Sequence, residues 1–261
     1  MKYQLEIENS DITNIGIKSI IDFYKSMSID NLQNVGTFAF VTGVPSPFLN
    51  VVIDIRHNRY NSNELLNTFN DFFDKYNMSW VWFINPASYE NDLEALGFKF
   101  IEEAPAMYFD LSQQLYNHVT QDIKIQELYR GDDLKTWIDP IKEAYEAPEE
   151  DDSFRKLNFE ILQKGSTQFK HFIAFQGNEV VGAGTLFCTN ESVMLHHLAT
   201  KKAYLRRGIG SALTVFMMNR AKELGFKHCF LDASEDGFNM YKKLGFKIYS
   251  RTLAYSNTII D

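Results

Sequence analysis

The sequence predicts an α/β fold of the α+β kind, with two domains that each carry a mixed, mostly antiparallel sheet flanked by helices. Three observations predict this fold. The 261 residues suit one large domain or two of modest size, and a hydrophobic content of 45% is enough for ordinary buried cores. Apolar residues recur with helix and strand periods along the chain. The order of these periods in the first half is repeated in outline in the second half.

The first half begins with a helix pattern and continues with alternating strands and helices. Apolar residues three and four apart predict helices, and short apolar runs predict strands. The expected helices are IKSIIDFYKSM (17–27), NELLNTFNDFFDKY (63–76) and YENDLEALGF (89–98). The expected strands are GTFAFVTG (36–43), NVVIDIR (50–56), MSWVWFIN (78–85) and the extended run FKFIEEAPAMYFDL (98–111). Trp80 and Trp82 are expected in the core.

The second half shows the clearer periodicity. The expected helices are LKTWIDPIKEAY (134–145), with a break near Pro140, SFRKLNFEILQK (153–164), a helix from the glycine turn near residue 208 to about Leu224, and DGFNMYKKL (236–244). The expected strands are DIKIQEL (122–128), FKHFIAF (169–175), EVVGAGTLF (179–187), SVMLHHLA (192–199), KHCFLDA (227–233) and the final extended run FKIYSRTLAY (246–255). A Gly177-Asn178 turn predicts a hairpin between the second and third of these strands.

The shared order of elements indicates a duplication. The tetrapeptide LGFK ends a helix pattern at 96–99, 224–227 and 244–247, so by itself it is partly a helix stop. The expected boundary lies within 111–121, giving domains 1–118 and 119–261. At the position of a glycine turn, the first half has RHNRYNSNE (56–64), which contains no glycine. We therefore expect the first domain to be a degenerate copy without a cofactor site of its own.

Composition and charge exclude several classes of protein. A net charge of −8 and a pI near 5.3 argue against a nucleic-acid binder, which needs a basic face. Cys188 and Cys229 match no zinc spacing and no disulfide framework, and Cys229 is expected to be buried. No metal site is expected. No run approaches the roughly 18–20 apolar residues of a membrane helix, and the acidic, alternating N-terminus is no signal peptide. A cytoplasmic location is therefore expected.

The stretch YLRRGIGSAL (204–213) predicts an anion site. Backbone amides at a helix start, with glycines that let the backbone approach, favour a phosphate. The dinucleotide pattern G-x-G-x-x-G is broken by Leu213, and the sequence has no Walker loop. A third pattern fits better: R/Q-x-x-G-x-G/A between a strand and a helix, with a tyrosine on a helix about thirty residues later.

These residues resemble the GCN5-related N-acetyltransferases (GNAT family). The likeness rests on MLHHLATKKAYLRRGIGSAL (194–213) and on LDASEDGFNMYKKLGF (231–246), which resemble the family's acetyl-CoA loop and its later strand–helix motif. It covers roughly residues 122–255. The whole chain resembles the tandem members of the family, in which a degenerate first domain precedes an acetyl-CoA-binding, catalytic second domain.

The resemblance implies acetyl-CoA as a cosubstrate. Main-chain groups of the loop and of the preceding strand would hold it, and Ser234 stands where many members carry an asparagine that contacts the coenzyme. The expected contacts are Leu198, Ala199, Thr200, Arg206, Arg207, Gly208, Ile209, Gly210, Ser211 and Ser234. One departure is Leu205, which occupies the family's Arg/Gln position, so weakened coenzyme affinity is expected.

The resemblance also assigns catalytic roles. Tyr241 corresponds to the general-acid tyrosine that protonates the departing thiolate. His196 is the candidate base: His196 and His197 are adjacent on a strand, so one is expected to face the cleft and the other the opposite side. Strand alternation favours His196 if Leu198 lies on the same face, although a bulge would break this count. Solvent is the alternative acceptor of the proton.

The expected activity is transfer of the acetyl group of acetyl-CoA to a primary amine by direct attack. The acceptor is a small molecule or a peptide, and the protein is a monomer or a homodimer. The acidic run APEEDDSF (147–154) either attracts an ammonium group or forms a solvated loop in which Asp152 or Ser153 caps the next helix. The alternative function is a sensor or scaffold that binds CoA or acyl-CoA without turnover, and a longer acyl donor is a further alternative.

Overall fold

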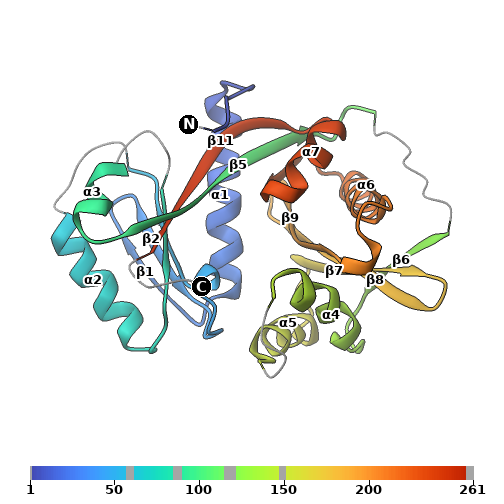
Figure 1. Ribbon diagram of the computed structural model, residues 1–261, viewed down its shortest axis with the longest axis horizontal. Coiled ribbons are helices and arrows are strands. Elements are labelled where there is room, and N and C mark those ends of the chain that lie inside the picture. The colour runs from blue at the N-terminus through green and yellow to red at the C-terminus, as the bar shows by residue number, and fades with distance from the viewer. Residues whose placement is uncertain (1, 57–61, 85–89, 115–121, 147–150, 257–261) are drawn as a thin grey trace. The chain divides into compact units, whose positions relative to one another are not determined.

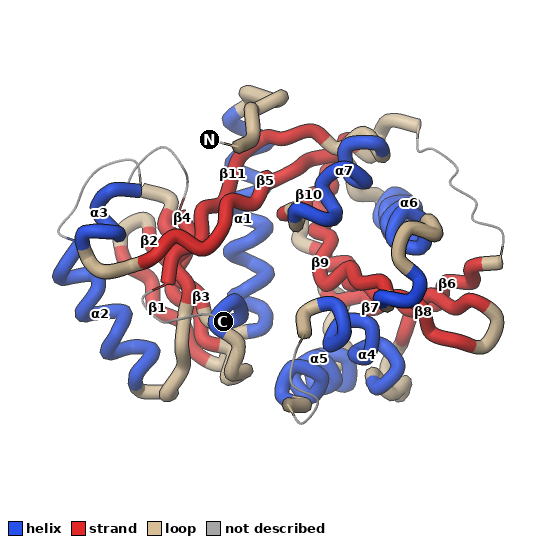
Figure 2. Tube along the Cα trace, in the orientation of Figure 1, coloured by secondary structure: helices blue, strands red, loops and turns tan. Residues whose placement is uncertain are grey.

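The computed structural model describes residues 2–56, 62–84, 90–114, 122–146 and 151–256. They divide into two compact units, each with a mixed, mostly antiparallel sheet and flanking helices, as the sequence predicts (Figures 1 and 2). Unit 1 comprises residues 1–107, 232–235 and 248–261, and unit 2 comprises residues 108–231 and 236–247. The predicted boundary between residues 118 and 119 lies outside the described residues.

Unit 1 holds the amino-terminal elements and the last strand of the chain. Its elements are α1 (Ser10–Met27), β1 (Asp30–Asn34), β2 (Thr37–Val41), a 3₁₀ turn (Pro47–Leu49), β3 (Val51–Asp54), α2 (Ser62–Asp74), β4 (Val81–Ile84), α3 (Glu90–Ala95), most of β5 (Lys99–Asp110) and β11 (Lys247–Ser256). The strand order is β1-β2-β3-β4-β11-β5, with β3 and β4 parallel and the pairs β1–β2, β2–β3 and β4–β11 antiparallel.

Aromatic side chains fill the core of unit 1. Trp80 and Trp82 are 3% and 1% exposed, so their predicted place in the core is confirmed. Trp80 stacks on Phe73 of α2 at 5.0 Å, and Phe69 meets Trp82 edge to face at 5.4 Å. At the end of β3, the chain carries a buried ion pair between Asp54 and Arg56. The rest of the glycine-free stretch, residues 57–61, lies outside the described residues.

Unit 2 holds the elements expected for the second half. They are β6 (Ile123–Leu128), α4 (Lys135–Ala144), α5 (Ser153–Gln163), β7 (Phe169–Gln176), β8 (Glu179–Cys188), β9 (Ser192–Thr200), a 3₁₀ turn η2 (Lys202–Tyr204), α6 (Ile209–Glu223), β10 (His228–Asp232) and α7 (Glu235–Lys243). Strands β6 to β9 pair antiparallel in chain order, and β10 lies parallel to β9. Figure 1 shows α4 and α5 on one face of this sheet and α6 on the other.

The strands that follow α3 and α7 are exchanged. β11 follows α7 in the chain, yet it pairs with β4, where Ala254 lies opposite Phe83. β5 follows α3, and its last residues lie beside β10 in unit 2. There the Tyr108 hydroxyl is hydrogen-bonded to Nδ1 of His228 at 3.1 Å, and the Leu111 amide donates to the Lys227 carbonyl. Neither sheet is therefore complete without a strand from the other half of the sequence.

The three LGFK tetrapeptides end α3, α6 and α7 in the same way. Gly97, Gly225 and Gly245 have φ of 87°, 89° and 96°, which glycine adopts without a steric cost. Each glycine amide donates to the carbonyl three residues back, and the next phenylalanine amide donates to the carbonyl five residues back, at 3.0–3.1 Å. This is the Schellman pattern of helix ends. The tetrapeptide is thus a helix stop at all three positions.

Three elements differ from the prediction. α1 begins at Ser10 rather than at residue 17, because Asn9 caps it there. α4 is not broken at Pro140: it runs on to Ala144, and its buried residues, Pro140 among them, hold it on the sheet. β1 was not expected, because DNLQN (30–34) has almost no apolar residues; it forms by pairing with β2 across a turn at Gly36, whose φ is 67°. Within the described part of the chain, no helix combines the length and the apolar character needed to cross a membrane.

Candidate active site

The glycine turn leads from η2 into α6 through two left-handed residues. Arg206 has φ of 63° and Gly208 has φ of 81°, and Gly208 is the N-cap of α6. The N-cap Gly208 has no side chain that could cap this helix, whereas Asn9 caps α1 by accepting from the amides of Asp11 and Ile12. The first amides of α6 have no acceptor within the helix, so they remain available for an anion.

Packing is tight around Gly210 at the start of α6. A Cβ on Gly210 would lie 3.1 Å from Sδ of Met240 on α7 and 3.7 Å from Oγ1 of Thr200, at the end of β9. Thr200, Gly210 and Met240, the residue before Tyr241, are therefore neighbours at the start of α6. The predicted coenzyme contacts Ile209 and Gly210 lie at this helix start as expected, with Ile209 buried. Their role stays a prediction.

Two glycines on β8 bring α6 close to the sheet. A Cβ on Gly182 would lie 2.9 Å from the Ala199 carbonyl oxygen and 3.0 Å from side chains of Ile209 and Leu213. A Cβ on Gly184 would lie 3.0 Å from Met217. The sequence reasoning did not single out these glycines. Their spacing of two residues, which places both on one face of a strand, is the signal that could have found them.

β9 carries a bulge next to the site. Between the pairs Thr185–His196 and Ala183–Ala199, β8 has one residue and β9 has two. His197 lies in this bulge with φ of 52°, a left-handed conformation that costs a residue with a side chain on the order of 1–3 kcal/mol. A bulge re-aims the side chains of the bulged strand. On the other side of β9, the register with β10 covers only Ser192–Met194.

The bulge corrects the predicted orientation of the two histidines. His197 packs against Trp137 of α4 and Phe154 of α5, with ring centroids at 6.1 and 4.9 Å. The His196 ring lies 5.7 Å from the His197 ring, so the two do not point to opposite faces. Leu198 contacts instead the α6 side of the sheet: its Cδ1 is 3.3 Å from the point where a Cβ on Gly184 would lie. The alternation assumed for His196 and Leu198 was wrong because the bulge interrupts it.

Burial keeps these imidazoles neutral. Burial and the neighbouring His197 hold the pKa of His196 well below its usual value, and burial lowers the pKa of His197 to about 4. His171 on β7 is fully buried, its Nδ1 lies 3.1 Å from Oγ1 of Thr185, and burial lowers its pKa to about 3. At neutral pH the rings can accept a proton, but holding the charged form at these buried positions is unfavourable.

Tyr241 lies on α7 with its ring 7% exposed and 5.7 Å from the Phe246 ring. Burial, with a smaller effect of Tyr145 and Cys229, raises the pKa of the phenol above its usual value. The hydroxyl is therefore protonated at neutral pH, as a proton donor must be.

Cations and one exposed leucine surround the glycine turn. Arg206 and Arg207 are exposed, and the Arg207 guanidinium lies 4.9 Å above the Tyr204 ring. The Tyr204 hydroxyl donates to Glu179 at 2.5 Å. Leu205 is 53% exposed and so contributes little to the core. The remaining predicted contacts are the buried Ala199, Ser211 in the first turn of α6, and the exposed Ser234 of unit 1.

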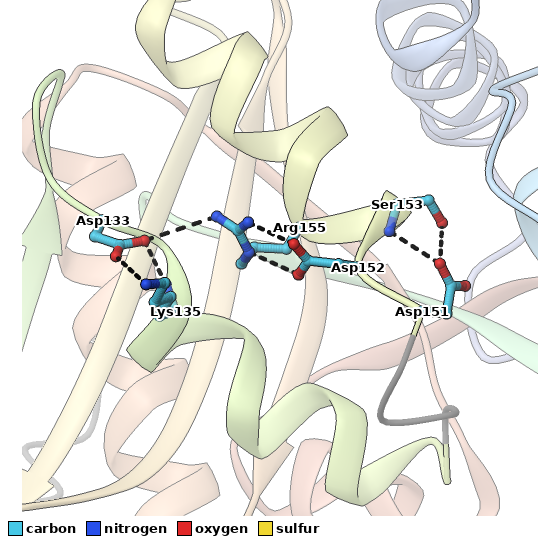
Figure 3. Close-up of polar contacts among 6 residues, drawn as sticks. All are labelled: Asp133, Lys135, Asp151, Asp152, Ser153 and Arg155. Atoms are coloured by element: carbon cyan, nitrogen blue, oxygen red, sulfur yellow. Dashed lines mark hydrogen bonds and ion pairs between the residues drawn. The ribbon is translucent and has the colours of Figure 1, made fainter.

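The described part of the acidic run has structural partners (Figure 3). Asp151 accepts from both the amide and the hydroxyl of Ser153, so Asp151 caps α5, and the predicted cap by Asp152 or Ser153 was wrong. Asp152 pairs with Arg155, whose other side reaches Asp133 at 3.7 Å. Residues 147–150 lie outside the described residues.

The end of α4 is joined to the start of η2 by a cation that the sequence reasoning missed. The Lys202 amide donates to Glu143 at 2.6 Å, and its Nζ bonds Glu146 at 2.7 Å. Both carboxylates precede the acidic run in the sequence. Glu143 lies one residue before the last residue of α4 and Glu146 two residues after it, and such a pair carries no distinctive sequence signal, which explains why it was missed.

Comparison with known proteins identifies a conserved domain type in the second half. The sequence of residues 167–248 matches the family model of the acetyltransferase (GNAT) domain. The matched part runs from β7 into β11 and includes the bulge, the glycine turn and Tyr241. No curated protein sequence matches the chain.

Solved structures with a similar fold extend over both units. A GCN5-related N-acetyltransferase from Kribbella flavida is 12% identical with a TM-score of 0.71, covering 92% of this chain and 94% of that one. One from Sphaerobacter thermophilus is 16% identical with a TM-score of 0.61, covering 87% and 78%. A tandem GNAT protein from the clavulanic acid biosynthesis pathway is 13% identical with a TM-score of 0.56, covering 86% and 79%. At these identities the likeness shows the fold.

Proposed function

Because the chain carries an acetyltransferase (GNAT) domain in a tandem GNAT fold, we propose that it transfers the acetyl group of acetyl-CoA to a primary amine. The observation that carries the proposal is the start of α6. It joins a helix N-terminus whose N-cap is a glycine, two left-handed turn residues and Gly210, where a Cβ would lie within 3.1 Å of Sδ of Met240. Such a backbone cradle suits the pyrophosphate of a coenzyme A.

The residues around this cradle fit the rest of the coenzyme. The register of β9 with β10 covers only Ser192–Met194, so in our proposal main-chain groups of Leu198 and Thr200 on that side contact the pantetheine arm and the thioester oxygen. A hydrogen-bond donor fixed where negative charge develops is a main source of catalysis in acyl transfer. Arg206 and Arg207 add positive charge beside the phosphates.

The reaction needs one proton removed and one supplied. The amine nitrogen forms a bond to the thioester carbon, and the carbon–sulfur bond breaks. In our proposal the Tyr241 hydroxyl protonates the departing thiolate, because burial keeps the phenol protonated until that charge appears. His196 and His197 are neutral at pH 7 and serve as a short relay for the amine proton to solvent rather than as its final acceptor.

Mass spectrometry of the purified protein, followed by an acceptor screen, tests the proposal. We expect CoA or acetyl-CoA to co-purify, and free thiol to appear from acetyl-CoA only when an amine is present. The panel contains polyamines, amino acids, peptides and aminoglycosides. Binding of CoA with no thiol release from any amine would instead indicate a sensor or scaffold. Absence of CoA binding would reject both functions.

A further inference from the structure

The bulge in β9 is held from the α4 side by one tryptophan. Trp137 is fully buried, and its indole Nε1 donates at 3.3 Å to the carbonyl of Gly184, the residue of β8 that faces the bulge. Backbone–backbone pairing is irregular at this position, so a side-chain donor replaces part of the ladder. The same indole contacts the His197 ring edge to face.

His197 occupies an unfavourable backbone conformation, and its side chain packs against aromatic rings of α4 and α5. Its φ of 52° is one that residues other than glycine rarely adopt. The Phe154 ring packs on it at 4.9 Å and the Trp137 ring at 6.1 Å, both edge to face. Unfavourable backbone conformations persist where the surroundings leave no alternative, and they concentrate at functional sites.

We propose that Trp137 and Phe154 are positioning residues that fix the β9 bulge and so aim the main chain of residues 197–200 at the acyl group of the coenzyme. This inference rests on the proposed function and deepens it, since neither ring touches the coenzyme in the proposed arrangement. Trp137 contacts the Gly184 carbonyl and the rings of His171 and His197. Phe154 contacts the His197 ring and the Trp137 ring itself. Loss of either ring lets His197 return toward an extended conformation and closes the strand pair.

The indole contact is tested by Trp137→Phe against a matched control, Trp82→Phe. Both tryptophans are at most 1% exposed, but within the described residues the Trp82 indole N–H has no hydrogen-bond partner. Amide exchange of residues 194–200 and CoA binding are measured in both variants. We expect at least tenfold faster exchange and at least fivefold weaker CoA binding in Trp137→Phe, with both unchanged in Trp82→Phe. Equal values in the two variants would overturn the role of the indole.

A second pair keeps the proposal testable if Trp137→Phe does not fold. Phe154→Leu removes a ring from His197, and Phe172→Leu removes a fully buried ring on β7 that contacts Phe216. We expect faster exchange at 194–200 only in Phe154→Leu, although Phe172→Leu lowers the melting temperature at least as much. The reverse pattern would reject the positioning role. Amide exchange is independent of turnover, so a failure of this inference is separable from a failure of the proposed acetyl transfer, which the acceptor screen reports.

Discussion

Burial sets the protonation states of the side chains at the end of β9 and on α7. Tyr241 keeps its proton at neutral pH, and its ring packs on Phe246, so a variant that lacks only the hydroxyl tests the proposed proton donor. Replacement by phenylalanine preserves the ring contact. We expect Tyr241→Phe to lower kcat more than tenfold, with coenzyme affinity and melting temperature nearly unchanged. Steady-state kinetics and CoA titration measure this, and an unchanged kcat would remove Tyr241 from the mechanism.

Leu205 is the residue at which the glycine turn departs from the GNAT pattern. Its side chain is 53% exposed, so a polar replacement costs little stability. We expect Leu205→Gln to tighten CoA binding about threefold to tenfold, the effect of roughly one added hydrogen bond. Leu224→Gln is the control, because Leu224 is exposed at the other end of α6. Isothermal titration compares the two, and equal affinities would show that position 205 does not touch the coenzyme.

The buried histidines make stability depend on pH. The pKa values of His171 and His197 are about 3 and about 4 in the folded protein, below the usual 6.5, so the unfolded chain binds more protons between these values. The free energy of unfolding is therefore highest above pH 6.5 and falls toward pH 4, by up to about 1.4 kcal/mol per pH unit for each ring. Urea unfolding at pH 7, 6 and 5 measures the slope. His171→Gln should reduce it, and an equal slope in this variant would contradict the prediction.

Residue identities alone led to part of the site. The glycine turn and Tyr241 could be predicted because their spacing is a chain-local pattern, and they lie at the start of α6 and on α7 as expected, while their roles stay predictions. The orientation of His196 and His197 was not, because an extra residue in a strand depends on its partner strand. Trp137 was missed for the same reason: its partner, the Gly184 carbonyl, is 47 residues away in sequence and becomes a neighbour only in the fold.

At the scale of elements, the start of α5 depends on one carboxylate. Asp151 accepts from the amide and the hydroxyl of Ser153. Loss of such a cap costs about 1 kcal/mol. We expect Asp151→Ala to lower the free energy of unfolding by that amount, whereas Asp139→Ala, at an exposed position within α4, should change it by less than about 0.5 kcal/mol. Chemical denaturation of both variants is the measurement, and similar values would argue against the cap.

Periodicity identified most elements, and packing decided the exceptions. The three LGFK helix ends follow from glycine and local hydrogen bonds, so the sequence predicts them well. α4 continues through Pro140 because Trp137, Ile138 and Ile141 are buried with it, which a local rule on proline does not include. β1 depends on a partner strand rather than on its own apolar residues, so its sequence carried almost no signal.

At the scale of the whole molecule, the exchanged strands make the two halves dependent on each other. β10 needs the end of β5, and β4 needs β11, in which Leu253 and Tyr255 are buried in the unit 1 core. We expect fragments 1–118 and 119–261 to aggregate when expressed separately and to co-purify as one folded complex when expressed together. Size-exclusion chromatography measures this. Removal of residues 257–261 alone, which follow β11, is the control and should leave the protein folded. A monomeric, folded 119–261 fragment would contradict the prediction.

The exchanged strands also affect the order in which the two sheets can be completed during synthesis. Domains ordinarily fold from the amino terminus as they emerge during synthesis. Here the sheet of unit 1 lacks β11 until residues 247–256 have been translated. Until then, β4 of the nascent amino-terminal half has no β11 to pair with. The first half of the chain is therefore expected to complete its sheet last. A recombination event that separates the halves would remove a strand from each, which ties the two copies together in evolution.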